Sequence, residues 1–113
     1  MAYNEQMADR IRRFFAPEDN IAERKMMGAL CFMMSGNMCC GVTGNALMIR
    51  VGSEQYPDLV GKPNVRPLEF AGRRPQGFLL VDPLGYQDPE AFKLWIQRGV
   101  DFAAKLPVKK PKR

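Results

Sequence analysis

The stretch that decides the fold is residues 29–51, which read ALCFMMSGNMCCGVTGNALMIRV. Two turn signals divide it, Ser35-Gly36-Asn37 and Gly44-Asn45. Short glycine–asparagine segments of this kind join neighbouring antiparallel strands through tight hairpins. The stretch therefore predicts a meander of three antiparallel strands.

Alternation along these strands separates two faces of the sheet, because successive side chains of a strand point to opposite sides. One face would carry Leu30, Phe32, Met34, Leu47, Ile49 and Val51. The opposite face would carry Cys31, Met33, Met48 and Arg50. We expect helices to cover the first face. The second face is mixed, and we expect it to meet water or a partner.

Upstream, apolar residues recur at helical spacing over residues 4–15, and Pro17 ends the pattern. Residues 24–34 favour a single strand in which Gly28 forms a bend or a bulge. An N-terminal helix would thus lead into the first strand of the meander.

Downstream, the pattern predicts a helix, an edge strand, an apolar strand, a turn and a last helix. The first helix would cover residues 54–60, and residues 62–67 would form a loop that tightens into the edge strand toward Phe70. The apolar strand would cover residues 77–81, the turn 82–85, and the last helix would begin at residue 88. Asp88-Pro89 is typical of a helix start, and Gly99 inside the helix indicates close packing. The order α-β3-α-β2-α predicts an α+β fold, a two-layer antiparallel sheet with helices on one face.

The charge is distributed unevenly along the 113 residues. The chain has 17 Lys plus Arg against 12 Asp plus Glu, a net charge of +5. Residues 105–113 contain five bases and no acid, so residues 1–104 are balanced at 12 of each sign. We therefore expect one domain over residues 1–106 and a basic tail over 107–113, with no strong positive field on the domain itself.

Catalytic and metal-binding patterns are missing from the sequence. There is no histidine, so the commonest general base and metal ligand is absent. The three cysteines, Cys31, Cys39 and Cys40, show no CxxC spacing, and we expect the adjacent pair to point to opposite faces of its strand. The sequence predicts no enzyme, catalytic residue, metal or cofactor. An enzyme would need an unrecognised site in a deep polar pocket.

Several segments together resemble the N-terminal domain family of TfoX. They are KMMGALCFM (25–33), GNMCCGV (36–42), LMIRVG (47–52), PLEFAGR (67–73) and GFLLV (77–81). Met27 and Ala29 stand where that family usually has phenylalanine and glycine. The resemblance implies a fold similar to type III secretion chaperones and a link to TfoX/Sxy regulators of bacterial competence genes. It implies no catalytic residues.

We therefore expect a non-enzymatic regulatory or protein-interaction domain, with a role in transcription or competence regulation. Its partner would be another protein or a second copy, and its contact surface would be Met33, Met48 and Arg50. The alternative is a nucleic-acid-binding protein. Its phosphate contacts would be Arg66, Arg73, Arg74, Lys109, Lys110, Lys112 and Arg113.

The expected location is the cytoplasm, without membrane attachment. No apolar stretch reaches the ~18 residues of a spanning helix, and the first residues lack the apolar core of a signal peptide.

Overall fold

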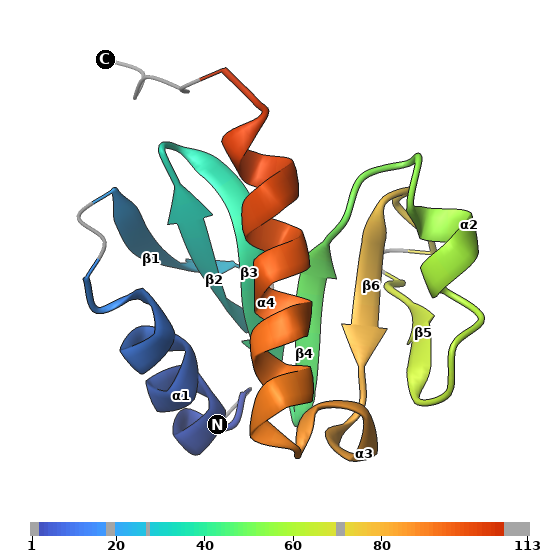
Figure 1. Ribbon diagram of the computed structural model, residues 1–113, viewed down its shortest axis with the longest axis horizontal. Helices are drawn as coiled ribbons and strands as arrows, with labels where there is room; N and C mark the ends of the chain where they lie inside the picture. The colour runs from blue at the N-terminus through green and yellow to red at the C-terminus, as the bar shows by residue number, and fades with distance from the viewer. Residues whose placement is uncertain (1–2, 18–19, 27, 70–71, 108–113) are drawn as a thin grey trace.

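The protein forms a six-stranded antiparallel sheet with helices packed on one face (Figure 1). The computed structural model describes residues 3–17, 20–26, 28–69 and 72–107. The elements are α1 (Glu5–Phe15), β1 (Ile21–Met26), β2 (Ala29–Met34), β3 (Asn37–Thr43), β4 (Ala46–Arg50), α2 (Tyr56–Leu59), β5 (Val65–Pro67), β6 (Phe78–Val81), α3 (Pro83–Tyr86) and α4 (Pro89–Ala104). The strand order across the sheet is β1-β2-β3-β4-β6-β5.

A side chain caps the start of each long helix, and the start at Asp88 is the one that the sequence predicts. The Asn4 side chain accepts hydrogen bonds from the backbone N–H groups of Gln6 and Met7 and so caps α1. The Asp88 carboxylate accepts from the backbone N–H of Ala91 and caps α4. Both helices turn their apolar side toward the sheet, which confirms the α+β class.

The predicted strand over residues 24–34 is wrong, because the chain reverses direction at its glycine. Gly28 has a φ of 78°, and β1 and β2 pair antiparallel with Met26 opposite Ala29. Glycine adopts this left-handed conformation without strain, which suits a tight reversal of the chain. The meander therefore has four strands. Residues 83–86 form the short helix α3 where a turn was predicted. The predicted order α-β3-α-β2-α therefore lacks one strand and one helix.

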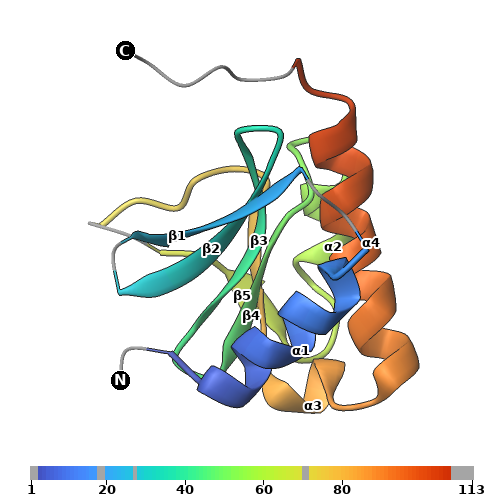
Figure 2. The same cartoon turned by 90° about the vertical axis from the view of Figure 1, so that its left-hand side faces the viewer.

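The predicted helix-covered face is confirmed. Its members form the main core with α1 and α4: Leu30, Phe32, Met34, Leu47, Ile49 and Val51. Figure 2 shows both helices on this side of the sheet, while the segment between β5 and β6 extends on the other side. Helices therefore cover one face of the sheet, whereas the segment between β5 and β6 lies on the side of the other face (Figure 2).

Cys39 and Cys40 do not point to opposite faces, contrary to expectation. Phe32 pairs with Cys40 and Met33 with Met38, so Cys39 is the extra residue of a β-bulge. The bulge places both cysteines in the helix-side core. Gly99 of α4 packs against this bulge, since a Cβ on it would lie 2.6 Å from the Cys39 carbonyl oxygen. The close packing predicted for Gly99 is confirmed.

Candidate functional site

The second face of the sheet is an apolar cluster of its own. Its buried members are Ala29, Cys31, Met38, Ala46, Met48 and Leu80, with Met26, Met33, Leu68 and Phe78 half-buried against them. Leu80 and Phe78 alternate along β6 toward this face. Four methionines lie here, so flexible and polarisable side chains make up much of the surface.

The predicted contact residues of this face differ in exposure. Met33 is half-buried, whereas Met48 is only 3% exposed. The expectation that Met48 stands on an open face is therefore wrong. Met48 pairs in register with Gly41, and a Cβ on Gly41 would lie 3.0 Å from the Met48 Cε. The missing side chain of Gly41 lets Met48 lie flat over β3.

A cavity of about 180 Å³ opens on this face beside Met48, and we refer to it as the apolar groove. It is lined by Met26, Cys31, Met38, Met48, Leu68, Pro75 and Phe78. The strands supply its floor, and Leu68 and Pro75 supply a wall from the segment between β5 and β6. Every lining residue is apolar, so the groove offers van der Waals contact without a hydrogen-bond partner.

Sequence reasoning missed the wall of the groove. Leu68 and Pro75 lie in a segment without periodicity, and their approach to β4 follows from the sheet order rather than from local pattern. The position of Phe78 on this face could have been predicted, because Phe78 alternates with Leu79 at the start of the apolar strand.

Arg50 serves to hold the end of β4 rather than to present a free charge. Its guanidinium carbon lies 5.4 Å from the ring centre of Phe78 and 5.3 Å from that of Phe102. Its Nη1 donates to the Met38 carbonyl oxygen at 3.4 Å. The side chain thus connects the rim of the apolar groove to α4 through two aromatic rings.

Two of the arginines predicted to contact phosphate are already paired with carboxylates. Arg66 donates to both carboxylate oxygens of Asp82 at 3.0–3.2 Å, and this hydrogen bonding raises the pKa of Arg66. Arg74 donates to Glu69 at 2.9 Å. Arg73 is exposed. These pairings neutralise much of the positive charge expected before β6.

The basic residues of the tail belong to the same prediction. Lys109, Lys110, Lys112 and Arg113 lie outside the described residues. The nucleic-acid hypothesis therefore rests on their charge in the sequence.

The three thiols are buried and free. Burial raises the pKa of Cys31, and burial together with a hydrogen bond to Cys39 raises that of Cys40. Both groups are therefore protonated at neutral pH, which is the unreactive form of cysteine. In the described part of the chain, no three His, Cys, Asp or Glu side chains gather where they could hold a metal ion.

Among the helices that the structure describes, none combines the length and the apolar character needed to cross a membrane.

Comparison with known families gives one assignment. The model of the TfoX N-terminal domain matches residues 13–103, which is most of the chain. The comparisons with curated proteins and with solved structures give no match. The chain belongs to the TfoX N-terminal domain family, and the similarity to type III secretion chaperones stays a prediction.

Proposed function

We propose that this member of the TfoX N-terminal domain family is a non-enzymatic regulatory domain that binds a protein partner through the apolar groove. One observation carries the proposal: an entirely apolar cavity of about 180 Å³ lies on the sheet face opposite α1 and α4. An apolar cavity of roughly 150 Å³ holds one benzene ring. The groove therefore suits a single aromatic or large aliphatic side chain of the partner.

Charge near the groove indicates what should flank that anchor. Arg24 is exposed and pairs in register with Cys31, so it lies on the groove side of β1. Arg73 is exposed two residues before Pro75. Neither arginine forms an ion pair with another described residue. We therefore expect the partner to be a protein segment with an apolar anchor between acidic residues.

The lining also bears on selectivity. Met26, Met38 and Met48 supply three of the seven lining side chains. Unbranched thioether side chains repack around differently shaped anchors at low cost. We expect the groove to accept phenylalanine, leucine or methionine, with the acidic flanks providing the discrimination.

Family membership supports a setting for this interaction. It favours competence-related regulation of transcription, with this domain acting by contact rather than by chemistry. The partner would be a protein of that regulatory system.

Binding can be tested with a synthetic nine-residue peptide that has a central phenylalanine flanked by glutamates. Methyl NMR of the methionines provides the readout, because Met26, Met38 and Met48 line the groove while Met7 and Met34 lie in the helix-side core. We expect saturable shifts of the three groove methyls, with smaller changes at the two core methyls.

Control peptides separate the contribution of the apolar anchor to binding from that of the flanking charges. A peptide with alanine at the centre, and one with lysine flanks, should each bind at least about tenfold more weakly, equivalent to ~1.4 kcal/mol. Leu68→Glu should abolish binding, while Leu84→Glu, at a side chain that is 70% exposed, should not. Unshifted groove methyls, or equal binding of all three peptides, would refute the proposal. If the protein instead forms a concentration-dependent dimer that Leu68→Glu dissociates, the partner in the groove would be a second copy of the chain rather than a segment of another protein.

We also propose, as the second candidate, nucleic-acid binding by the basic tail. The observation favouring it is the run of five bases without an acid in residues 105–113. Affinity for a fluorescent 20-nucleotide DNA should then fall steeply with salt. Removal of residues 107–113 should remove most of it, and an unaltered affinity would exclude the tail.

A further inference from the structure

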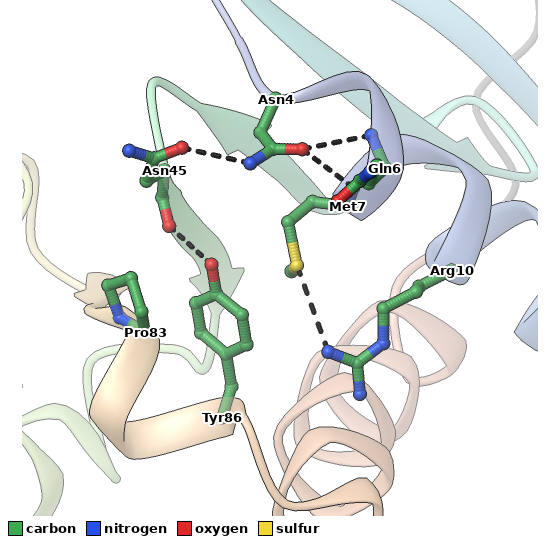
Figure 3. Close-up of a pocket in the computed structure, with 7 residues that line it drawn as sticks. All are labelled: Asn4, Gln6, Met7, Arg10, Asn45, Pro83 and Tyr86. Carbon is green, nitrogen blue, oxygen red and sulfur yellow. Dashed lines mark hydrogen bonds between the residues drawn. The ribbon is translucent and has the colours of Figure 1, made fainter.

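A second cavity lies on the helix side, where α1 begins and α3 packs against the β3–β4 turn (Figure 3). Its volume is about 360 Å³, within the range of small-molecule sites. It is lined by Asn4, Gln6, Met7, Arg10, Asn45, Pro83 and Tyr86. It shares no lining residue with the apolar groove, and it is mixed in polarity where the groove is apolar.

A hydrogen-bond network fixes one wall of this polar pocket. The Asn4 Nδ2 donates to the Asn45 Oδ1 at 2.9 Å, and the Asn4 Oδ1 accepts from the backbone of α1. The Tyr86 hydroxyl donates to the Asn45 carbonyl oxygen. Three elements distant in sequence are thereby joined at Asn45 (Figure 3). Such a pre-formed wall lowers the entropic cost of ordering side chains around a ligand.

Arg10 faces this wall, and its guanidinium forms few hydrogen bonds with the residues that the structure describes. Its guanidinium carbon lies 4.1 Å from the ring centre of Phe92, so the planar group is stacked in place. Its recorded hydrogen bond is a weak one, from Nη1 to the Met7 Sδ at 4.0 Å. Within the described residues it forms no ion pair.

Three other arginines are paired with carboxylates, unlike Arg10. Arg12, Arg66 and Arg74 each form an ion pair with a described Asp or Glu. Arg10 instead points its fork of donors toward a cavity bordered by the half-buried Asn4 and the buried Tyr86. Arginine recognises planar oxyanions through paired, charge-assisted hydrogen bonds.

We infer that the polar pocket binds a small organic anion, whose carboxylate or phosphate oxygens accept hydrogen bonds from Arg10. Met7 and Pro83 supply apolar contact for the body of the ligand. The Tyr86 oxygen and the Asn4 side chain lie opposite for a polar substituent (Figure 3). The site is one of binding, and it is separate from the apolar groove, since the two share no lining residue.

The electrostatic setting agrees with this assignment. Burial raises the pKa of Tyr86, Arg10 lowers it, and the Asp82 carboxylate, which is paired with Arg66, raises it, so both charged groups lie close enough to the hydroxyl to interact with it. The hydroxyl remains protonated at neutral pH and does not compete with an anion for Arg10.

Three ring compounds test the inference by backbone amide NMR titration of the full chain at constant ionic strength: benzoate, phenyl phosphate and neutral benzyl alcohol. We expect saturable shifts at Gln6, Met7 and Asn45 with at least one of the two anions and none with benzyl alcohol. The tighter anion identifies the group, carboxylate or phosphate. No saturation with either anion, or equal binding of the alcohol, would overturn the inference.

A matched pair of variants identifies the arginine. Arg98 also stacks on an aromatic ring, at 4.5 Å from the ring centre of Trp95, and does not line the pocket. Arg10→Met should weaken anion binding at least about tenfold, because a charge-assisted hydrogen bond is lost. Arg98→Met should change it by less than about twofold. Equal losses in both variants would mean general charge attraction and would reject the site.

A second variant covers the case in which Arg10→Met fails to fold. Asn45→Asp keeps the acceptor for Asn4 and places a negative charge beside the pocket at an exposed position. It should weaken binding of the anion by about tenfold, whereas unchanged affinity would contradict the inference.

Discussion

The two faces of the sheet are both apolar, yet they are built differently. The helix face is closed by α1 and α4, and its central side chains Leu47, Ile49 and Leu79 are fully buried. The opposite face is covered by the segment between β5 and β6, and it retains the apolar groove beside Met48.

The difference teaches where stability and binding reside in this domain. A face filled by branched side chains at native density loses free energy whenever one methylene is removed. A face made of methionines around an existing cavity can change shape with less loss. The helix face should therefore hold the fold together, and the groove face should be available to a partner.

The largest expected effect comes from truncating neighbours on β4 that point to opposite faces. Leu47→Ala should lower the free energy of unfolding by about 3–4 kcal/mol, because it opens a cavity in the sealed core. Met48→Ala should cost about 1–2 kcal/mol, since its side chain already borders a cavity. Urea unfolding measures both, and equal losses would contradict the distinction between the faces.

A smaller loss is expected where α4 presses on the bulge of β3. Gly99→Ala places a Cβ 2.6 Å from the Cys39 carbonyl oxygen and should lower the free energy of unfolding by about 1–3 kcal/mol, despite the better helix propensity of alanine. Gly61→Ala is the matched control, because its Cβ would meet nothing within 4 Å. A neutral Gly99→Ala would mean that α4 can move away from the sheet.

Local signals allowed much of the fold to be predicted from the sequence. The hairpins at Ser35-Gly36-Asn37 and Gly44-Asn45 and the helix start at Asp88 each depend on a few adjacent residues. The two faces followed from alternation within single strands.

The features that the sequence did not predict share one cause, because each depends on contacts with residues distant in the chain. Strand β1 is the edge of the sheet and mostly exposed, so its sequence IAERKM lacks an apolar alternation. The bulge at Cys39 is a property of the pairing between β2 and β3, not of β3 alone. The wall of the groove likewise depends on where the chain passes after β5. The polar pocket combines α1, Asn45 and α3 for the same reason.

Thiol reactivity gives a finer comparison of the two faces. Cys31 lies on the groove face, whereas Cys40 lies in the helix-side core. Burial raises the pKa of both thiols, so each reacts only after its face of the sheet has opened. We expect Cys31 to react about tenfold faster with N-ethylmaleimide, since opening the groove face exposes it without releasing a helix.

Peptide mass spectrometry after timed labelling measures these rates. Equal rates for Cys31 and Cys40 would show that both thiols are reached only through global unfolding. The groove face would then be as firmly closed as the helix face.

The smallest effect belongs to the ion pairs outside both cores. Arg66 and Asp82 are about half and one-third exposed, at 53% and 38%, so solvent screens their attraction. A double-mutant cycle with Arg66→Ala and Asp82→Ala should give a coupling free energy of about 0.5 kcal/mol that decreases in 1 M salt. A coupling above about 2 kcal/mol would show that this pair anchors β5 to the sheet, and that the groove wall starting at Leu68 is held by charge rather than by apolar packing.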